Sequence, residues 1–337
     1  MKQQDAPRNS MTASTPSDLP TLDAIRDTAK LVYQAVPPTP QYAWPLLCER
    51  AGTEVWVKHE NHTPIGAFKV RGGLVLLDQL KRDHPGLPGT ITATKGNHGQ
   101  SIGFAAKRLG LMAVIVVPHG NSVEKNHAMR ALGVELIEHG DDFQAALEHA
   151  GVLSQQRGLI PIPPVHEALI RGVATYSLEF LENVPPLDTV YVPIGMGSGF
   201  CAMAAARRAL NLTTNIVGVV SEHAPTYALS YEQGKPVPHP VSTKLADGLA
   251  CRQVDGSALS VVTQHAERIV RVTDDEVAAA MRYYFTDTHN VAEGAGAAAL
   301  AAALKLRGEL RGLRVGLPLS GGNVDREVFA GVLAQAD

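Results

Sequence analysis

Short apolar runs alternate with amphipathic segments along most of this 337-residue chain. The apolar runs are rich in β-branched residues and predict strands at Glu54 to Lys58, Thr90 to Thr94, Met112 to Val117, Val134 to Glu138, Thr189 to Pro193, Asn215 to Ser221 and Arg314 to Pro318. The amphipathic segments predict helices at Phe68 to Lys81, His98 to Leu109, Val123 to Leu132, Phe143 to Gln156 and His166 to Leu181. Strands that alternate with helices are typical of parallel sheets with helices on their faces, so we expect the α/β fold class.

The overall composition favours a soluble protein of two domains that share a cleft. Hydrophobic residues make up 45% of the chain, and there are 31 glycines. Thirty Lys and Arg face 33 Asp and Glu, and no long run carries one sign, so we expect neither nucleic acid nor a membrane as partner. No apolar stretch is long and uncharged enough to cross a bilayer. A small molecule is the expected ligand.

Cysteine usage and the amino terminus indicate a cytoplasmic protein. Cys48, Cys201 and Cys251 lie far apart and form no CxxC pair, so neither a disulfide framework nor a zinc site is predicted. Residues 1–20 are polar and rich in Ser, Thr and Pro, without the apolar core of a secretory signal, and they predict a mobile tail. Prolines 161, 163 and 164 interrupt the pattern and mark a plausible domain junction.

Lys69 is the first candidate for chemistry. Residues 60–72, ENHTPIGAFKVRG, follow a predicted strand, turn through Pro64 and Gly66, and enter a helix with Lys69 in its first turn. The positive end of the helix dipole and partial burial both disfavour the ammonium, which frees an amine to attack an aldehyde. An isolated lysine at a helix start is more often an ordinary surface residue, so the neighbouring motifs must decide.

A second motif, TKGNHGQ at residues 94–100, joins a predicted strand to a predicted helix. Its glycines let the backbone approach a ligand closely, and the amides at the helix start suit a carboxylate. Asn97 could bond a ring hydroxyl of a ligand, and His98 could be a base or a packed ring. The alternative is that Asn97 only caps the helix.

A glycine-rich turn, VPIGMGSGF at residues 192–200, runs from a predicted strand into an alanine-rich helix after Cys201. Small residues at the head of a helix expose amide protons to an anion, so this turn is a candidate phosphate cradle. A dinucleotide fold is the rival interpretation, because Glu222 closes the next strand where a ribose-binding acid could lie. However, the glycines alternate and do not form GxGxxG.

Ser320 opens the last motif, SGGN, after a short apolar strand. Open α/β sheets place their ligands at the carboxyl ends of strands, where Ser320 would stand. The segment lacks the GxSxG elbow of a nucleophilic serine, so a neutral hydrogen bond to a ring nitrogen is the better use of the hydroxyl. The alternative is an ordinary Ser-Gly-Gly turn.

Six motifs together resemble a known family. PIGAFKVRG, TKGNHGQ, GMGSG, ADGLA (residues 246–250), EGAG (residues 293–296) and SGGN occur in the order found in serine and threonine dehydratases. From Thr21 onward the chain is similar to the tryptophan-synthase-β-like, fold type II enzymes that use pyridoxal 5'-phosphate. The resemblance implies two open, twisted, mostly parallel sheets. It also implies a small domain at 66–166, a large domain at 21–65 plus 167–337, and a cofactor in the cleft between them.

The resemblance also implies roles for individual residues. Lys69 would be the Schiff-base lysine, Phe68 would pack beside the cofactor ring, and Ser320 would face the pyridine nitrogen. Asn97 would meet the ring hydroxyl, and Glu293 would also lie at the cofactor. The phosphate would be held by Gly195, Met196, Gly197, Ser198 and Gly199, and the substrate carboxylate by Thr94, Lys95, Gly96, Asn97 and His98.

The implied reaction is a β-elimination. A neutral serine opposite the ring nitrogen makes the ring a weaker electron sink than an acid would, so elimination competes well with transamination. The freed Lys69 amine would remove the α-proton, and loss of the β-hydroxyl would lead to a 2-oxo acid and ammonia. Threonine and serine are the default substrates. Lys95 combined with GMGSG looks more like the branch that includes phenylserine dehydratases, so phenylserine is the leading alternative.

Several residues depart from the family pattern. Lys95 stands where relatives carry a small residue, and it could pair with the substrate carboxylate, act as a second base, or compete with Lys69 for the aldehyde. We favour the first or the third of these. Met196 and Ser198 replace glycines, and Gly294 replaces a proline. The aspartate that helps bind a divalent cation in serine racemase is missing after Glu222, so we expect no metal site.

Other functions remain open at this stage. An amino-acid racemase on the same fold is the nearest rival, and a non-catalytic amino-acid-binding protein is the rival from another class. A dehydrogenase would bind a nicotinamide cofactor instead. The length leaves no room for the regulatory domain of biosynthetic threonine deaminases, so we expect an unregulated catabolic enzyme. Relatives are usually dimers, and we expect a homodimer.

Overall fold

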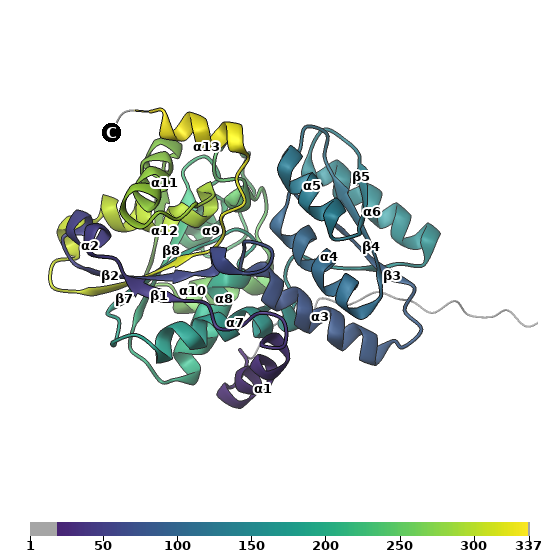
Figure 1. The fold of residues 1–337 in the computed structure, drawn as a ribbon, viewed down its shortest axis with the longest axis horizontal. Coiled ribbons are helices and arrows are strands. Elements are labelled where there is room, and N and C mark those ends of the chain that lie inside the picture. The colour runs from purple at the N-terminus through teal and green to yellow at the C-terminus, as the bar shows by residue number, and fades with distance from the viewer. Residues whose placement is uncertain (1–18, 336–337) are drawn as a thin grey trace, which may run out of the picture.

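The computed structural model describes residues 19–335, which form two lobes (Figure 1). Most of the predicted tail, residues 1–18, lies outside the described residues. Leu19, which the tail prediction includes, is instead buried, and its carbonyl oxygen accepts a hydrogen bond from Arg208. Leu19 is therefore part of the packed structure.

The larger lobe is built on a six-stranded sheet with the order β1-β2-β10-β7-β8-β9. The edge strand β1 pairs antiparallel with β2, and the other neighbours are parallel. The strands are β1 (Gln41–Ala43), β2 (Glu54–His59), β7 (Thr189–Pro193), β8 (Asn215–Ser221), β9 (Arg268–Val272) and β10 (Arg314–Leu319). The helices of this lobe are α1 (Leu22–Val32), α2 (Pro45–Ala51), α7 (Glu167–Glu182), α8 (Ser198–Ala209), α9 (Thr226–Gln233), α10 (Gly256–His265), α11 (Asp274–Thr288), α12 (Gly294–Lys305) and α13 (Arg326–Leu333), with short 3-10 turns η1 (Glu60–His62), η2 (Asp247–Leu249) and η3 (Arg307–Glu309).

The smaller lobe contains a four-stranded parallel sheet with the order β5-β4-β3-β6. Its strands are β3 (Gly89–Ala93), β4 (Met112–Val117), β5 (Glu135–Glu138) and β6 (Ile160–Pro161). Its helices are α3 (Lys69–Asp83), α4 (Asn97–Leu109), α5 (Val123–Ala131) and α6 (Phe143–Arg157), and α3 lies at the junction of the lobes (Figure 1). All four strands come from between residues 66 and 166, although the exact domain limits remain a prediction.

The α/β prediction is confirmed, and each predicted strand begins and ends within one residue of an observed strand. One helix start was predicted wrongly, because α8 begins at Ser198 and not after Cys201. Gly197 has φ 102°, a left-handed conformation that glycine adopts without strain, so the chain enters the helix directly after it. The helix head thus falls inside the glycine-rich turn itself.

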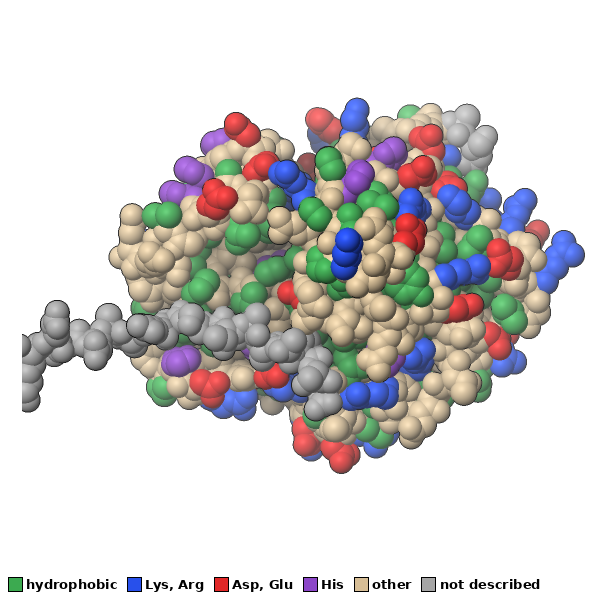
Figure 2. All heavy atoms as spheres, turned by 180° about the vertical axis from the view of Figure 1, so that it is seen from behind, with side chains coloured by type: hydrophobic (Ala, Val, Ile, Leu, Met, Phe, Trp, Pro, Cys, Tyr) green, Lys and Arg blue, Asp and Glu red, His purple; other side chains and the backbone are tan. Residues whose placement is uncertain are grey.

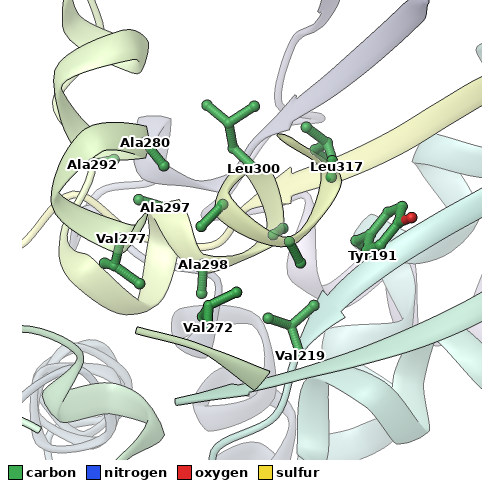
Figure 3. Close-up of a cluster of buried hydrophobic side chains, with 14 of the residues drawn as sticks. Tyr191, Val219, Val272, Val277, Ala280, Ala292, Ala297, Ala298, Leu300 and Leu317 are labelled. Atoms are coloured by element: carbon green, nitrogen blue, oxygen red, sulfur yellow. The ribbon is translucent and has the colours of Figure 1, made fainter. Parts of the chain in front are cut away.

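The alanine-rich helix α12 forms the centre of the larger core. Figure 3 shows its residues Ala297, Ala298 and Leu300 packed between side chains of the sheet, such as Val219, and side chains of α11, such as Val277. Alanine side chains let the helix approach its neighbours closely, and a helix that is apolar all round belongs in a core. Among residues 19–335, no helix has both the length and the apolar character needed to cross a bilayer.

Four buried charges lock the start of α3 to the larger lobe. Arg71 Nε and Nη2 donate to Glu60 Oε2 and Oε1 at 2.8 and 2.9 Å, and Arg71 Nη1 donates to Glu179 Oε1 at 2.6 Å. Lys58 Nζ donates to Glu179 Oε2 at 2.7 Å. None of these side chains is more than 6% exposed, and the two positive and two negative charges balance. Because Arg71 is two residues after Lys69, this network holds that lysine in place.

Removing Arg71 is expected to destabilise the fold strongly. Arg71→Ala leaves two buried carboxylates with one cation, which should lower the free energy of unfolding by about 3–5 kcal/mol. Urea titration followed by circular dichroism measures this. Arg157→Ala is the control, because it breaks an exposed pair with Glu135 and should cost about 1 kcal/mol or less. Equal losses in the two variants would contradict the role given to the buried network.

Candidate active site

The candidate site lies where the two lobes face each other. A cavity of about 380 Å³ there is lined by side chains from both lobes, including Lys95, Lys125, Asp247, Glu293 and Asn323. Figure 2 shows the molecule from behind, where acidic and basic side chains are mixed over the visible face without a large patch of one sign. The cavity between the lobes is therefore the candidate site for a small-molecule ligand.

A short backbone bridge brings two of the predicted motifs together. Ala67 and Gly321 form an antiparallel bridge, Phe68 N donates to Ser320 O at 3.0 Å, and Gly322 N donates to Gly66 O at 2.9 Å. Gly66 has φ +67°, and a Cβ there would lie 2.7 Å from Asn323 Oδ1, so glycine is required at this position. The loop before α3 is thus fixed to the carboxyl end of β10.

Lys69 is the first residue of α3, in the helical turn where the sequence predicts it. Its Nζ donates to Ser198 Oγ at 2.8 Å, and it forms no ion pair with any residue of the described chain. Burial lowers the pKa of Lys69 to about 8, and the nearby Cys251 opposes this shift weakly. About a tenth of Lys69 is therefore the neutral, nucleophilic amine at pH 7, compared with less than about a thousandth for a lysine of ordinary pKa.

The head of α8 offers a row of free amide protons next to Lys69. Within residues 19–335, no backbone acceptor is found for the amides of residues 195–200. A Cβ at Gly195 would lie 2.3 Å from the carbonyl oxygen of Gly248, so no larger residue fits there. Tyr227 OH donates to Met196 O at 2.9 Å and holds the turn. Amides aligned at a helix amino terminus form an anion site.

Asn97 does not cap its helix, so the capping interpretation is wrong. The N-cap of α4 is Gly96, and no side chain bonds the helix start. The Asn97 side chain instead donates from Nδ2 to Glu293 Oε1 at 2.5 Å and accepts at Oδ1 from Asn323 Nδ2 at 2.8 Å. Both bonds cross to the larger lobe, and together they orient the Asn97 amide.

The predicted carboxylate loop has three free amides. Thr94 N donates to Val116 O at 3.0 Å, and Gly96 N donates to Thr94 Oγ1 at 3.1 Å, so these two amides are already bonded. Along the described chain, no acceptor is found for the amides of Lys95, Asn97 and His98. These amides begin α4, where the helix dipole favours an anion.

His98 is a neutral ring at physiological pH. Burial, and secondarily the charge of Lys69, lower the pKa of His98 to about 3. Its Nε2 is buried, and no hydrogen-bond partner for it occurs among residues 19–335. A ring with so low a pKa is a poor general base, so His98 is better suited to contact a ligand as a neutral donor or acceptor.

Ser320 directly follows β10, as the sequence predicts. The residue is 9% exposed, and its carbonyl oxygen accepts the Phe68 amide. Its hydroxyl forms no hydrogen bond with another residue in the described part of the chain. A hydroxyl without a protein partner is available to a ligand.

Cys251 belongs to this site, although sequence reasoning gave it no role. Burial raises the pKa of Cys251 to about 11, and the charges of Lys69 and then Lys95 oppose that rise. Both lysine charges therefore act on the one thiol. Lys95 forms no ion pair or hydrogen bond with another described residue. The available signal was position, because Cys251 directly follows ADGLA.

The chain is similar to known proteins in sequence and to solved structures in fold. A family model described as "Pyridoxal-phosphate dependent enzyme" matches residues 32–321. The chain is 32% identical over 321 residues to the biosynthetic L-threonine dehydratase of Haemophilus influenzae, covering 94% of this chain and 62% of that protein. It thus spans less than two thirds of that relative. It is 31% identical over 307 residues to the catabolic L-threonine dehydratase of Escherichia coli, covering 90% and 92% of the two chains. Maize serine racemase superposes with a TM-score of 0.86 at 28% identity, covering 93% and 97%.

The lowered pKa of Lys69 predicts a specific pH dependence of stability. In the unfolded chain Lys69 titrates near 10.5, and in the folded chain near 8, so between these values the unfolded chain binds more protons. The free energy of unfolding of the cofactor-free protein should therefore rise with pH from 8 to 10.5, by at most about 3 kcal/mol. Lys69→Met should lack this rise. Denaturant titrations across this pH range test it, and an equal pH dependence in both proteins would contradict the assignment.

Proposed function

Since this chain belongs to the pyridoxal-phosphate-dependent enzyme family and has its type II fold, we propose that it eliminates water from a 3-hydroxy amino acid and releases ammonia and a 2-oxo acid. One observation carries the proposal. The Lys69 amine, with its pKa lowered to about 8, lies 2.8 Å from Ser198 at the head of α8, where six amides are free. Relatives of the chain in sequence include threonine dehydratases.

The free groups of the site fit pyridoxal phosphate part by part. The Lys69 amine suits its aldehyde, the amides of residues 195–200 suit its phosphate, and the Ser320 hydroxyl suits its ring nitrogen. A Cβ at Gly199 would lie 3.6 Å from the Phe68 ring, so the phosphate turn and this aromatic face adjoin. The site therefore combines three groups that the cofactor needs. These are amide donors for its phosphate, an amine for its aldehyde and a neutral hydroxyl for its ring nitrogen.

The roles of the residues follow from this arrangement. Pyridoxal phosphate, when bound, supplies an aldehyde for covalent attachment and a ring that withdraws electrons from the substrate Cα. Lys69 would hold it and, once replaced by the substrate amine, would accept the α-proton at Nζ. Ser198 Oγ would orient that amine. Loss of the α-proton and the β-hydroxyl removes water, and hydrolysis of the enamine product yields the 2-oxo acid and ammonia.

The substrate carboxylate would bind at the start of α4. The free amides of Lys95, Asn97 and His98 point to this role, and the Lys95 ammonium, which has no partner within residues 19–335, adds a full positive charge. Lys95 could alternatively take the aldehyde in place of Lys69, because the charges of both amines act on the same thiol, that of Cys251. We favour the carboxylate role, since Ser198 orients Lys69 and not Lys95.

The cavity beside the site favours a small polar substrate. Most of the side chains that line its 380 Å³ are charged or polar, and Pro118, Leu245, Val324 and Val328 are its apolar members. A phenyl ring gains most from an apolar pocket. We therefore keep threonine and serine as the expected substrates, ahead of phenylserine, the alternative that Lys95 and GMGSG suggest.

A racemase is the second candidate, supported by the similarity to serine racemase and by two groups that could act on the other face of Cα. These groups are Lys95 and the Cys251 thiol, whose pKa responds to the charges of both Lys69 and Lys95. However, burial raises the pKa of Cys251 to about 11, so the thiol is a weak source of thiolate at neutral pH. Incubation of single enantiomers in deuterated water, with chiral analysis of the amino acid, separates racemisation from elimination.

The enzyme is expected to release 2-oxo acid from threonine and serine faster than from phenylserine. Lys69→Ala should abolish this turnover, because no other amine is oriented for the α-proton. Lys95→Met should raise the KM by roughly tenfold with a smaller change in kcat, because it removes one charge from the carboxylate site. A coupled 2-oxo acid assay measures all three. Turnover that survives in Lys69→Ala would overturn the role given to Lys69. A cofactor-loaded wild type that releases no 2-oxo acid from any of the three amino acids would overturn the proposed function.

A further inference from the structure

Lys125, a residue outside the predicted site, links the two lobes by charge. It lies in α5 of the smaller lobe, and its Nζ donates to Asp247 Oδ2 at 2.7 Å and to Glu293 Oε2 at 3.1 Å. Both acids belong to the larger lobe, Asp247 in η2 and Glu293 at the N-cap of α12. Lys125 is 6% exposed and Glu293 is 2% exposed, so both members of this ion pair are nearly shielded from solvent. A buried charge pair of this kind is costly to break.

The aliphatic stem of Lys125 also packs on the loop that carries Asn97. A Cβ at Gly96 would lie 2.5 Å from Lys125 Cδ, so the loop approaches the stem as closely as glycine permits. Lys125 therefore supports the start of α4 by packing and reaches Glu293 by charge. These two contacts converge on the residue that follows Gly96.

Glu293 connects Lys125 to Asn97, because its carboxylate bonds both residues. One carboxylate oxygen, Oε2, accepts from Lys125, and the other, Oε1, accepts from Asn97 Nδ2 at 2.5 Å. Burial raises the pKa of Glu293, and the Lys125 ammonium opposes that rise, while Asp247 adds to it. Without Lys125, the carboxyl group would face Asp247 alone and would hold a proton more readily. A protonated Oε1 could donate instead of accept, and the Asn97 amide would be free to turn.

We propose that Lys125 is a positioning residue that orients the Asn97 amide across the interface between the two lobes. The inference rests on the proposed function, and it takes from the family resemblance that the Asn97 side chain meets the ring hydroxyl of the cofactor. Other contacts also join the lobes nearby. Asn323 Nδ2 donates to Asn97 Oδ1 at 2.8 Å and also holds this amide, whereas the contacts of Ser122 with Asp325 and of Glu124 with the amide of Arg326 include neither Asn97 nor Glu293.

The test compares Lys125→Met with Lys125→Arg in the cofactor-loaded protein. Methionine keeps an unbranched stem on Gly96 but removes the charge, whereas arginine keeps the charge. Lys107→Met, at an exposed position in α4, is the control for the loss of a lysine. The readouts are the visible absorption band of the bound cofactor, its titration with pH, and the separate values of kcat and KM.

The proposal expects Lys125→Met to shift the band or its titration and to lower kcat by roughly tenfold or more with a smaller change in KM. Lys125→Arg should recover most of both, and Lys107→Met should match the wild type. A Lys125→Met protein that loses thermal stability but keeps the wild-type band, titration and kcat would show a merely structural role and overturn the proposal. If Lys125→Met does not fold, Lys125→Gln takes its place with the same expected results.

These outcomes are separable from failure of the proposed function. The absorption band and its titration are measured without substrate, so they test Lys125 even if no hydroxy amino acid is turned over. A wild-type protein that binds the cofactor but eliminates no water contradicts the proposed reaction and leaves the Lys125 test intact. An unchanged band in Lys125→Met, beside normal wild-type turnover, contradicts only the positioning role.

Discussion

The backbone bridge between residues 66–68 and 320–322 is the contact on which the rest of the site depends. It joins the loop before α3 to the end of β10, although the two segments are about 250 residues apart in the sequence. Because Lys69 follows the first segment and Ser320 begins the second, one pair of backbone hydrogen bonds sets an amine and a hydroxyl in fixed relation. Parallel strands end on the same edge of the sheet, so the head of α8 after β7 joins them there.

Buried charges are paired on one side of this bridge, around Arg71, but not on the other side, around Lys69. Around Arg71, two cations and two carboxylates neutralise each other, which makes the start of α3 rigid. Around Lys69, no described carboxylate forms an ion pair with the amine, so burial lowers its pKa and favours the neutral form. The same burial keeps His98 uncharged. A rigid, neutral frame therefore surrounds a reactive amine, which is the arrangement that preorganised sites require.

The sequence predicts the elements whose residues carry a strong local signal. Strands such as Met112–Val117 and Asn215–Ser221 match the β-branched runs, and Ser320 falls at the end of its strand as expected. Contacts between distant residues have no such signal. Lys125 looks like an ordinary helix-surface lysine, and its partner Glu293 is 168 residues away. Asn97 has a good capping sequence, but the long-range bonds to Glu293 and Asn323 determine its orientation. Local propensity yields to tertiary contacts at these positions.

The account stands on Lys69 as the amine that carries the cofactor. Borohydride reduction of the purified, cofactor-loaded protein makes that bond permanent, and peptide mass spectrometry then locates the modified lysine. We predict a single modified peptide that contains Lys69, because its amine is lowered in pKa and oriented by Ser198. Modification at Lys95 instead, or no modified lysine in a protein that retains the cofactor, would contradict this account.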